Sequence, residues 1–225
     1  MKSKLSRRSF IKKTATLCSG AALLSSGLLS LTGLVTASNG NTLRVKFGMI
    51  IDNTKCIGCG LCQQACSTRH ELPEGEYFIK LYKDYERGMH PNIVVENFTT
   101  QCNHCDNAPC ARICPTGATY LNEEGIMVMN AKKCIGCKGC ITACPYNARI
   151  WSEKTGTPEK CNFCDGFVQA GKEPACVSVC PRDARIFGDL NDANGKLSKM
   201  IIERRLEPLK AELGTKPKIY YVRHK

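Results

Sequence analysis

Sixteen of the seventeen cysteines fall into four runs of four, and this spacing limits what the chain can fold into. The runs are Cys56, Cys59, Cys62 and Cys66; Cys102, Cys105, Cys110 and Cys114; Cys134, Cys137, Cys140 and Cys144; and Cys161, Cys164, Cys176 and Cys180. The first and third runs read C-x2-C-x2-C-x3-C, and proline follows the last cysteine of three runs, at Pro115, Pro145 and Pro181. Thiols at this density are metal ligands or cross-links, so the chain must be organised around them.

The spacing is typical of cysteines that bind [4Fe-4S] clusters. Three thiolates from one short loop reach three irons of a cubane. The fourth, which follows after three residues and precedes proline, reaches the neighbouring cluster, so the runs work in pairs. Sixteen cysteines therefore predict four [4Fe-4S] clusters. Because these clusters must supply much of the folding free energy, we expect the chain to be largely unfolded without them.

Residues 1–37 have the composition of a twin-arginine signal peptide. Ser-Arg-Arg-Ser-Phe stands at 6–10, six basic residues occur without an acidic one, and an uncharged stretch from Thr14 to Val35 precedes a small-residue site ending at Ala37. We expect export to the periplasm and cleavage after Ala37. The alternative is an uncleaved membrane anchor, although ten of the twenty-two residues from Thr14 to Val35 are Ser, Thr or Gly. Cys18 lies in this segment and is not a predicted ligand.

Zinc and disulfides are the alternative uses of the cysteines. Zinc sites with four cysteines usually combine two well-separated C-x2-C pairs, which is not the pattern here. Export favours disulfides, but the twin-arginine route carries proteins that have already folded in the reducing cytoplasm. The pattern therefore favours clusters over both alternatives.

The net charge of +12 does not indicate nucleic-acid binding. Without the six basic residues of the signal peptide the charge is +6, and four oxidised clusters with their thiolates would add about −8. The basic residues are also scattered rather than gathered in one stripe. No catalytic residue and no directly bound small-molecule substrate are predicted.

The repeats predict an α+β fold made of two pseudo-symmetric ferredoxin-like modules. Cys-Pro-x-x-Ala recurs at 114–118, 144–148 and 180–184, which we interpret as a ligand followed by a short helical turn and then a strand. Residues 101–144 form the inner two-cluster module. Residues 38–100 and 145–188 form the outer module, which carries the first and fourth runs and an insertion at 67–100.

Local patterns place the strands and one helix. A strand is expected within 42–51, another at 93–95, a hairpin joins 119–121 to 126–129, and a second hairpin spans about 150–158. The C-terminal segment, residues 189–225, is predicted to hold a helix over 198–213, interrupted near Pro208, and an extended tail at 216–222. The tail either covers the core or docks on a partner.

Several longer segments indicate a family. They include Gln-Cys-Asn-His-Cys-Asp-Asn-Ala-Pro-Cys at 101–110, Cys-Pro-Thr-Gly-Ala at 114–118 and Leu-Gly-Thr-Lys-Pro-Lys-Ile-Tyr at 213–220. On these segments the chain resembles the exported four-cluster ferredoxin subunits of quinone-linked respiratory reductases, over nearly its whole length. The resemblance is greatest to the iron-sulfur subunit of formate-dependent nitrite reductase, and next to those of tetrathionate, polysulfide and dimethyl sulfoxide reductases.

The resemblance implies how the four runs share their ligands. The first run pairs with the fourth and the second with the third. The implied ligand sets are Cys56, Cys59, Cys62 with Cys180; Cys161, Cys164, Cys176 with Cys66; Cys102, Cys105, Cys110 with Cys144; and Cys134, Cys137, Cys140 with Cys114. One departure is that Ser67, not proline, follows Cys66, which leaves the turn there less determined.

Three residue types near the runs have open roles. His104 is interpreted as a neighbour of the ligands or a surface residue, not as a ligand. The lysines beside the third run, Lys132, Lys133 and Lys138, either raise the potential of that cluster, meet an acidic partner or form a solvated face. Trp151 is interpreted as a packing residue.

The resemblance implies an electron-transfer subunit that is not itself catalytic. Electrons would come from an integral membrane partner that oxidises quinol, enter near the third run and leave near Cys56, Cys59 and Cys62 for a periplasmic reductase. The terminal reductase is expected to be a multihaem cytochrome, for example for nitrite or sulfite. The alternatives are a molybdopterin-dependent reductase for tetrathionate, polysulfide or dimethyl sulfoxide, and a zinc-stabilised interaction module without redox chemistry. The protein would attach to the inner membrane peripherally, through its partner.

Overall fold

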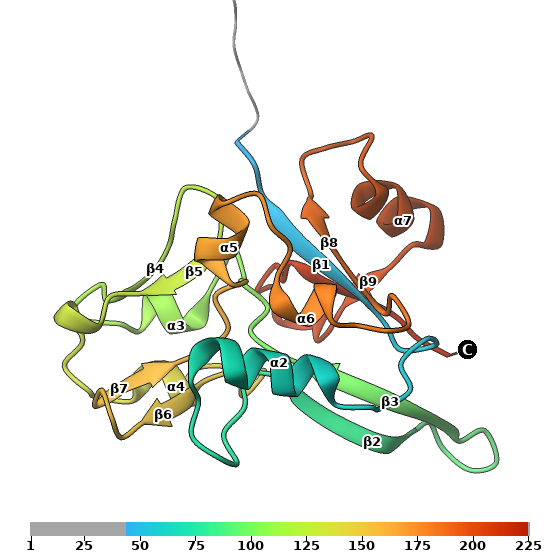
Figure 1. Cartoon of the computed structure of the whole chain (residues 1–225), viewed down its shortest axis with the longest axis horizontal. Helices are drawn as coiled ribbons and strands as arrows, with labels where there is room; N and C mark the ends of the chain where they lie inside the picture. The colour runs from blue at the N-terminus through green and yellow to red at the C-terminus, as the bar shows by residue number, and fades with distance from the viewer. Residues whose placement is uncertain (1–43, 225) are drawn as a thin grey trace, which may run out of the picture. The chain divides into compact units, whose positions relative to one another are not determined.

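The computed structural model describes residues 44–224 (Figure 1). The predicted signal peptide at 1–37 and Cys18 lie outside the described residues. Among the helices within residues 44–224, none has the length and apolar character needed to cross a membrane.

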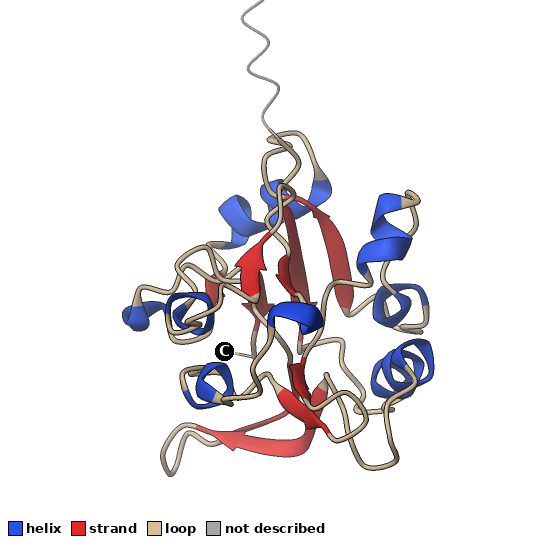
Figure 2. Cartoon of the chain, turned by 90° about the vertical axis from the view of Figure 1, so that its left-hand side faces the viewer, coloured by secondary structure: helices blue, strands red, loops and turns tan. Residues whose placement is uncertain are grey.

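A four-stranded sheet contains the most deeply buried strand. It has the order β8-β1-β10-β9, formed by β8 (Arg185–Asp189), β1 (Phe47–Asp52), β10 (Ile219–Val222) and β9 (Glu207–Pro208). Strand β1 runs antiparallel to β8 and parallel to β10. Its apolar residues Met49, Ile50 and Ile51 are at most 1% exposed, as a strand with neighbours on both sides requires. Figure 2 shows the strands along the middle of the chain with helices on either side.

The extended tail predicted at 216–222 supplies an inner strand of this sheet. Strand β10 lies between β1 and β9, and its residues Ile219 and Tyr221 are 0% and 4% exposed. Of the two interpretations of the tail, the structure therefore has the one in which it covers the core.

The helix predicted over 198–213 is wrong in its second half. Helix α7 (Lys196–Arg204) ends where Arg205 takes a left-handed conformation, and Glu207–Pro208 then pairs with β10 as strand β9. Pro208 has no N–H to donate and disfavours helical geometry at Glu207, so the helix cannot pass this point. An edge strand tolerates the same proline. A short 3-10 turn, η2 (Ala211–Leu213), follows.

Three two-stranded hairpins complete the strands. The two predicted hairpins are confirmed as β4 (Thr119–Leu121) with β5 (Met127–Met129), and β6 (Ile150–Ser152) with β7 (Thr157–Glu159). The third pairs β2 (Lys80–Arg87) with β3 (Val94–Thr100). The strand predicted at 93–95 is longer than expected, and β2 is not predicted because most of its side chains are polar and exposed. A ribbon that is exposed in this way lacks the apolar alternation by which strands are recognised.

A short turn follows the last cysteine of each Cys-Pro repeat, as predicted: the N–H groups of Gly117, Asn147 and Asp183 donate to the carbonyl oxygens of Cys114, Cys144 and Cys180. A short helix that was not predicted also precedes each of these cysteines. Helices α3 (Pro109–Arg112), α4 (Gly139–Thr142) and α6 (Ala175–Ser178) each end just before the last cysteine of a run. Proline disfavours helical geometry at the residue before it, so the helix stops before Cys-Pro and the chain turns into a strand. The remaining short elements are α5 (Asp165–Gln169) and η1 (Ala131–Lys133).

Helix α2 (Leu61–His70) is the exception to this rule. Cys66 lies inside it, and because Ser67 rather than proline follows, the helix continues to His70. The departure noted in the first run thus has a structural consequence. The described residues mix short helices and strands, in agreement with an α+β fold, whereas the division into two pseudo-symmetric modules stays a prediction.

Candidate metal centres

The core is built around cysteines. All sixteen cysteines in residues 44–224 are free thiols. Seven of them are buried in the main hydrophobic core, and they are Cys66, Cys102, Cys105, Cys110, Cys140, Cys161 and Cys176. A core that contains this many unpaired thiols is unusual unless the thiols bind metal, because little apolar surface remains to stabilise it.

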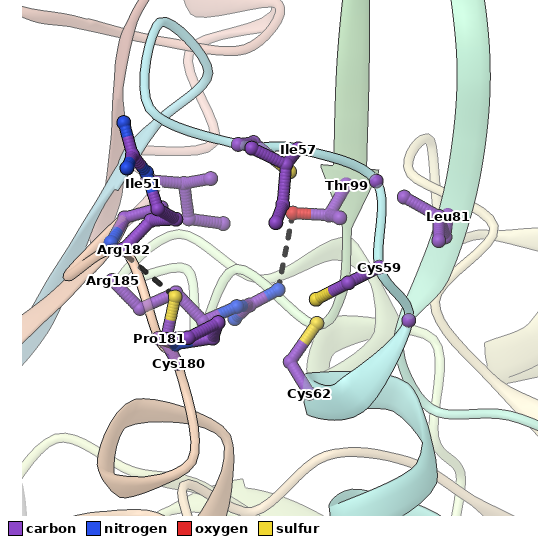
Figure 3. Close-up of a pocket in the computed structure, with 14 residues that line it drawn as sticks. Ile51, Ile57, Cys59, Cys62, Leu81, Thr99, Cys180, Pro181, Arg182 and Arg185 are labelled. Atoms are coloured by element: carbon purple, nitrogen blue, oxygen red, sulfur yellow. Dashed lines mark hydrogen bonds between the residues drawn. The ribbon is translucent and has the colours of Figure 1, made fainter.

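Cysteine group 1 consists of Cys56, Cys59, Cys62 and Cys180, which line one hollow. Three of them come from the loop between β1 and α2 and the start of α2, and the fourth precedes β8. Figure 3 shows the sulfurs of Cys59, Cys62 and Cys180 turned toward a shared space. The loop is tight: Gly58 has φ 67°, and a Cβ there would lie 2.4 Å from the side-chain oxygen of Asn97.

Two further hollows are each lined by four cysteines. Group 3 consists of Cys102, Cys105, Cys110 and Cys144. Group 4 consists of Cys134, Cys137, Cys140 and Cys114. In both, the fourth cysteine comes from the other run, and the short helices α3 and α4 hold Cys110 and Cys140 on their buried sides.

Group 2 consists of Cys66, Cys161, Cys164 and Cys176, all between 5% and 7% exposed. Helix α2, which carries Cys66, packs against α6, which carries Cys176. One turn after Cys66, the His70 ring nitrogen Nε2 lies 3.8 Å from the sulfur of Cys164. Helices α2 and α6 thus bring Cys66 and Cys176 together, and His70 of α2 lies beside Cys164.

Burial keeps several of these thiols protonated in the absence of metal. It raises the pKa of the Cys66 thiol to about 12, with Cys176 and Cys164 adding to the effect. It likewise raises the pKa of the Cys105 thiol to about 12. Metal binds the thiolate, so its binding must displace these protons.

Backbone N–H groups point at several of the sulfurs. Gly136 donates to the sulfur of Cys134 over 3.4 Å, Phe163 to that of Cys161 over 3.4 Å, and Ala184 to that of Cys180 over 3.3 Å. Such bonds stabilise negative charge on sulfur. They are one of the means by which a protein adjusts the potential of an iron-sulfur cluster.

Unpaired positive charge in the core supports an anionic metal centre. The Arg149 side chain lines the hollow of group 3, is 4% exposed, and has no partner for either terminal nitrogen. A guanidinium cannot lose its proton, so a buried one needs a nearby anion. A cluster with four thiolate ligands carries net negative charge, and the residues around group 3 therefore fit it.

The four thiols of each group do not converge on one point. Within residues 44–224, no three or more Cys, His, Asp or Glu side chains are placed to hold a single metal ion. Ligands of a cubane each reach a different iron, so they stand farther apart than ligands of one zinc ion.

His104 is buried, not on the surface. It is 0% exposed, its Nδ1 accepts the backbone N–H of Met127 over 3.0 Å, and its ring stacks on Phe163 at 3.7 Å. Burial, with the charges of Lys160, Lys218 and Arg149, lowers its pKa well below the usual range. His104 is therefore a neutral packing residue beside group 3.

The lysines beside the third run lie toward solvent. Lys132 and Lys133 are exposed, and the ammonium of Lys138 lies 4.2 Å from the centre of the Trp151 ring. Trp151 packs as predicted, under this lysine.

Sequence reasoning missed three buried cations, Arg149, Lys160 and Arg185, which are 4%, 7% and 4% exposed. A signal for two of them was present. Both arginines stand at the same place in the repeat, as Cys-Pro-Tyr-Asn-Ala-Arg at 144–149 and Cys-Pro-Arg-Asp-Ala-Arg at 180–185. A charged residue that recurs at one position relative to a ligand indicates a role at that ligand.

Comparison with known proteins agrees with this site. Residues 93–190 match the 4Fe-4S dicluster domain, and residues 47–68 match a 4Fe-4S binding domain. The B chain of polysulfide reductase from Wolinella succinogenes is 42% identical over 182 residues, which are 80% of this protein and 95% of the relative. Protein NrfC of Escherichia coli is 40% identical over 192 residues, 84% of this protein and 86% of the relative. The B subunit of tetrathionate reductase from Salmonella typhimurium is 35% identical over 223 residues, which are 96% of this protein and 88% of the relative.

These relatives match at least 80% of this protein and most of their own length. The predicted resemblance to respiratory reductase subunits is thereby confirmed at the level of the family. This protein belongs to the 4Fe-4S iron-sulfur electron-transfer subunits of respiratory reductases.

Proposed function

We propose that each of the four cysteine groups holds one [4Fe-4S] cluster. Three hollows, each lined by four cysteines from two runs, carry this proposal. In every hollow three cysteines come from one run and the fourth from another, which is the ligand sharing of two-cluster ferredoxins. A cluster in each group would accept and release one electron at a time.

The order of the groups supports a relay. Arg185 lines the hollow of group 1 and contacts Cys176 of group 2, and Lys160 donates to the carbonyl oxygens of Cys161 in group 2 and of Met127, which lines the hollow of group 3. Helix α3 with Cys110 of group 3 packs against α4 with Cys140 of group 4. These neighbours make a row from group 1 to group 4. Of the sixteen thiols, only Cys59 of group 1 and Cys137 of group 4 are exposed. Electrons would thus enter and leave at the two ends, and the buried groups between them would be shielded from solvent.

The proposed donor is an integral membrane subunit that oxidises quinol, and the proposed acceptor is a periplasmic terminal reductase of the multihaem cytochrome type. The twin-arginine pattern at 6–10 supports a periplasmic location. In this proposal the donor meets the end with Cys137, and the acceptor meets the end with Cys59.

A molybdopterin-dependent reductase is the second candidate for the acceptor. The relatives from polysulfide reductase and tetrathionate reductase favour it. Both candidates use the same relay and differ only in the protein that receives the electrons. A zinc-stabilised interaction module is a third candidate, from another class.

Two measurements test these proposals. The first is iron and acid-labile sulfide in anaerobically purified protein, with expected values of about sixteen each per molecule and a broad visible absorbance that dithionite bleaches. Zinc in place of iron would reject the relay. The second is mass spectrometry of proteins that co-purify with the mature protein. A multihaem cytochrome supports the first acceptor, and a large molybdopterin subunit replaces it with the second.

A further inference from the structure

A buried cation lies at each boundary between successive cysteine groups: Arg185 between groups 1 and 2, Lys160 between groups 2 and 3, and Arg149 in the hollow of group 3, where helix α3 packs against α4 of group 4. We propose that these three side chains set the reduction potentials of the clusters on both sides of each boundary. The proposal rests on the proposed function of the groups as cluster ligands.

Arg185 bridges groups 1 and 2. It lines the hollow of group 1, and its Nη1 lies 3.7 Å from the sulfur of Cys176 in group 2. The guanidinium is held in place by bonds to Gln101 over 2.7 Å and to Thr99 over 3.0 Å. Figure 3 shows the bond to Thr99 and the guanidinium lying between Cys180 and Cys62. Gln101 and Thr99 are both neutral, so they leave the positive charge of Arg185 to be balanced by the thiolates.

Arg149 occupies the corresponding position between groups 3 and 4. It lines the hollow of group 3, and neither terminal nitrogen has a partner. Helix α3, which carries Cys110 of group 3, packs against α4, which carries Cys140 of group 4. Arg149 therefore lies in the hollow of group 3 where group 4 adjoins it. Its repeat position, five residues after the last cysteine of a run, is the same as that of Arg185.

Lys160 joins the two middle groups. It directly precedes Cys161 of group 2, and its ammonium donates to the carbonyl oxygen of that residue over 3.0 Å. It also donates to the carbonyl oxygen of Met127, which lines the hollow of group 3. No carboxylate in residues 44–224 forms an ion pair with Lys160, Arg149 or Arg185.

The physical effect follows from charge. An electron that arrives at a buried cluster adds one negative charge in a medium of low dielectric constant, and a fixed cation beside it stabilises that charge. Because each cation lies beside two groups, it stabilises the electron on either side of the boundary, and the difference between the two sites stays small. Each transfer removes one electron from one site and adds it to the next, with no bond formed or broken and no proton moved.

Arg149 gives the sharpest test, in the complete mature protein with its clusters. Arg149→Gln removes the charge, Arg149→Lys keeps it, and Lys133→Gln is the control, since Lys133 is an exposed lysine directly before group 4. Each variant is assayed for iron and then titrated with reductant while paramagnetic resonance follows the clusters. We expect Arg149→Gln to lower the electron affinity of two of the four clusters by about tenfold, which is about 59 mV for a one-electron couple. Arg149→Lys should restore most of this shift, and Lys133→Gln should shift no cluster by more than about twofold.

A purely structural role predicts a different result. If Arg149→Gln holds its full iron and no potential moves, the proposal is overturned, although the relay itself stands. If that variant loses iron, Lys160→Gln repeats the test at the boundary of groups 2 and 3, where the new amide removes the charge but keeps N–H donors beside the two carbonyls. A fall in the potentials of two clusters then supports the proposal, and unmoved potentials overturn it. Absence of iron and sulfide from the unaltered protein would instead reject the proposed function.

Discussion

The ammonium of Lys218 lies 2.8 Å from a carboxylate oxygen of Asp106, although the Lys218 side chain is only 1% exposed. The same ammonium donates to the carbonyl oxygens of His104 over 2.8 Å and Gly125 over 2.6 Å. Lys218 directly precedes β10, and Asp106 follows Cys105 of group 3. This one side chain therefore fastens the C-terminal strand to the loop that carries Cys105.

Replacement of Asp106 should destabilise the fold. Asp106→Asn leaves the buried Lys218 ammonium without its counter-ion, so we expect the free energy of unfolding to fall by about 1–2 kcal/mol. This loss is small for a charged hydrogen bond because the Asp106 side chain is one third exposed. Glu123→Gln is the control, since it removes an ion pair with Arg44 in which both side chains are largely exposed, and should cost less than about 1 kcal/mol. Anaerobic denaturant unfolding measures both, and equal losses would contradict this reasoning.

A side chain at Gly58 should damage group 1 alone. Gly58→Ala forces an ordinary residue into φ 67° and places its Cβ 2.4 Å from the Asn97 oxygen. The left-handed conformation costs about 1–2 kcal/mol by itself, and the clash distorts the loop. We expect about twelve irons per molecule instead of about sixteen. Gly75→Ala shares the left-handed conformation, with φ 81°, but meets no atom within 4 Å, so it should keep all its iron.

Proline after Cys66 should harm the protein even though it follows the last cysteine of the other three runs. Helix α2 continues through residue 67 to His70, and a proline inside a helix costs about 3 kcal/mol. Ser67→Pro is expected to lower the thermal unfolding temperature and the iron content. Ser67→Ala, which loses only a 3.4 Å bond to the carbonyl of Glu76, should change neither by much. A Ser67→Pro variant with unchanged stability would mean that α2 need not extend past Cys66.

Loss of a ligand should matter more in group 2 than in group 4. Cys176 is 6% exposed and packs in the core against Arg185, whereas Cys137 is exposed. Cys176→Ser is therefore expected to leave little soluble, iron-containing protein, because group 2 loses a ligand inside the core and Arg185 loses one of the two anionic groups beside it. Cys137→Ser should yield folded protein with only the cluster of group 4 altered. Iron analysis and circular dichroism separate the two, and similar yields for both variants would speak against a structural role for the buried cluster.

The four cysteine runs, the hairpins at 119–129 and 150–158 and the α+β class could be predicted from local rules. Ligand spacing, turn residues and short apolar strands are written within a few neighbouring residues, so the sequence alone contains them. The end of α7 at Arg204 and the strand β2 were not predictable in this way. The first depends on the pairing of Glu207–Pro208 with β10, the next strand, and the second on an exposed ribbon without an apolar pattern.

The sequence by itself determined the ligand types and, through the family resemblance, the electron-transfer role. Only the tertiary structure buried the tail as β10 and buried Arg149, Lys160 and Arg185 beside the cysteine groups. The reason is that thiol ligands occur in short local motifs, whereas the burial of a charge depends on segments that meet only after folding. Whether an arginine faces solvent or a cluster is decided by what packs around it.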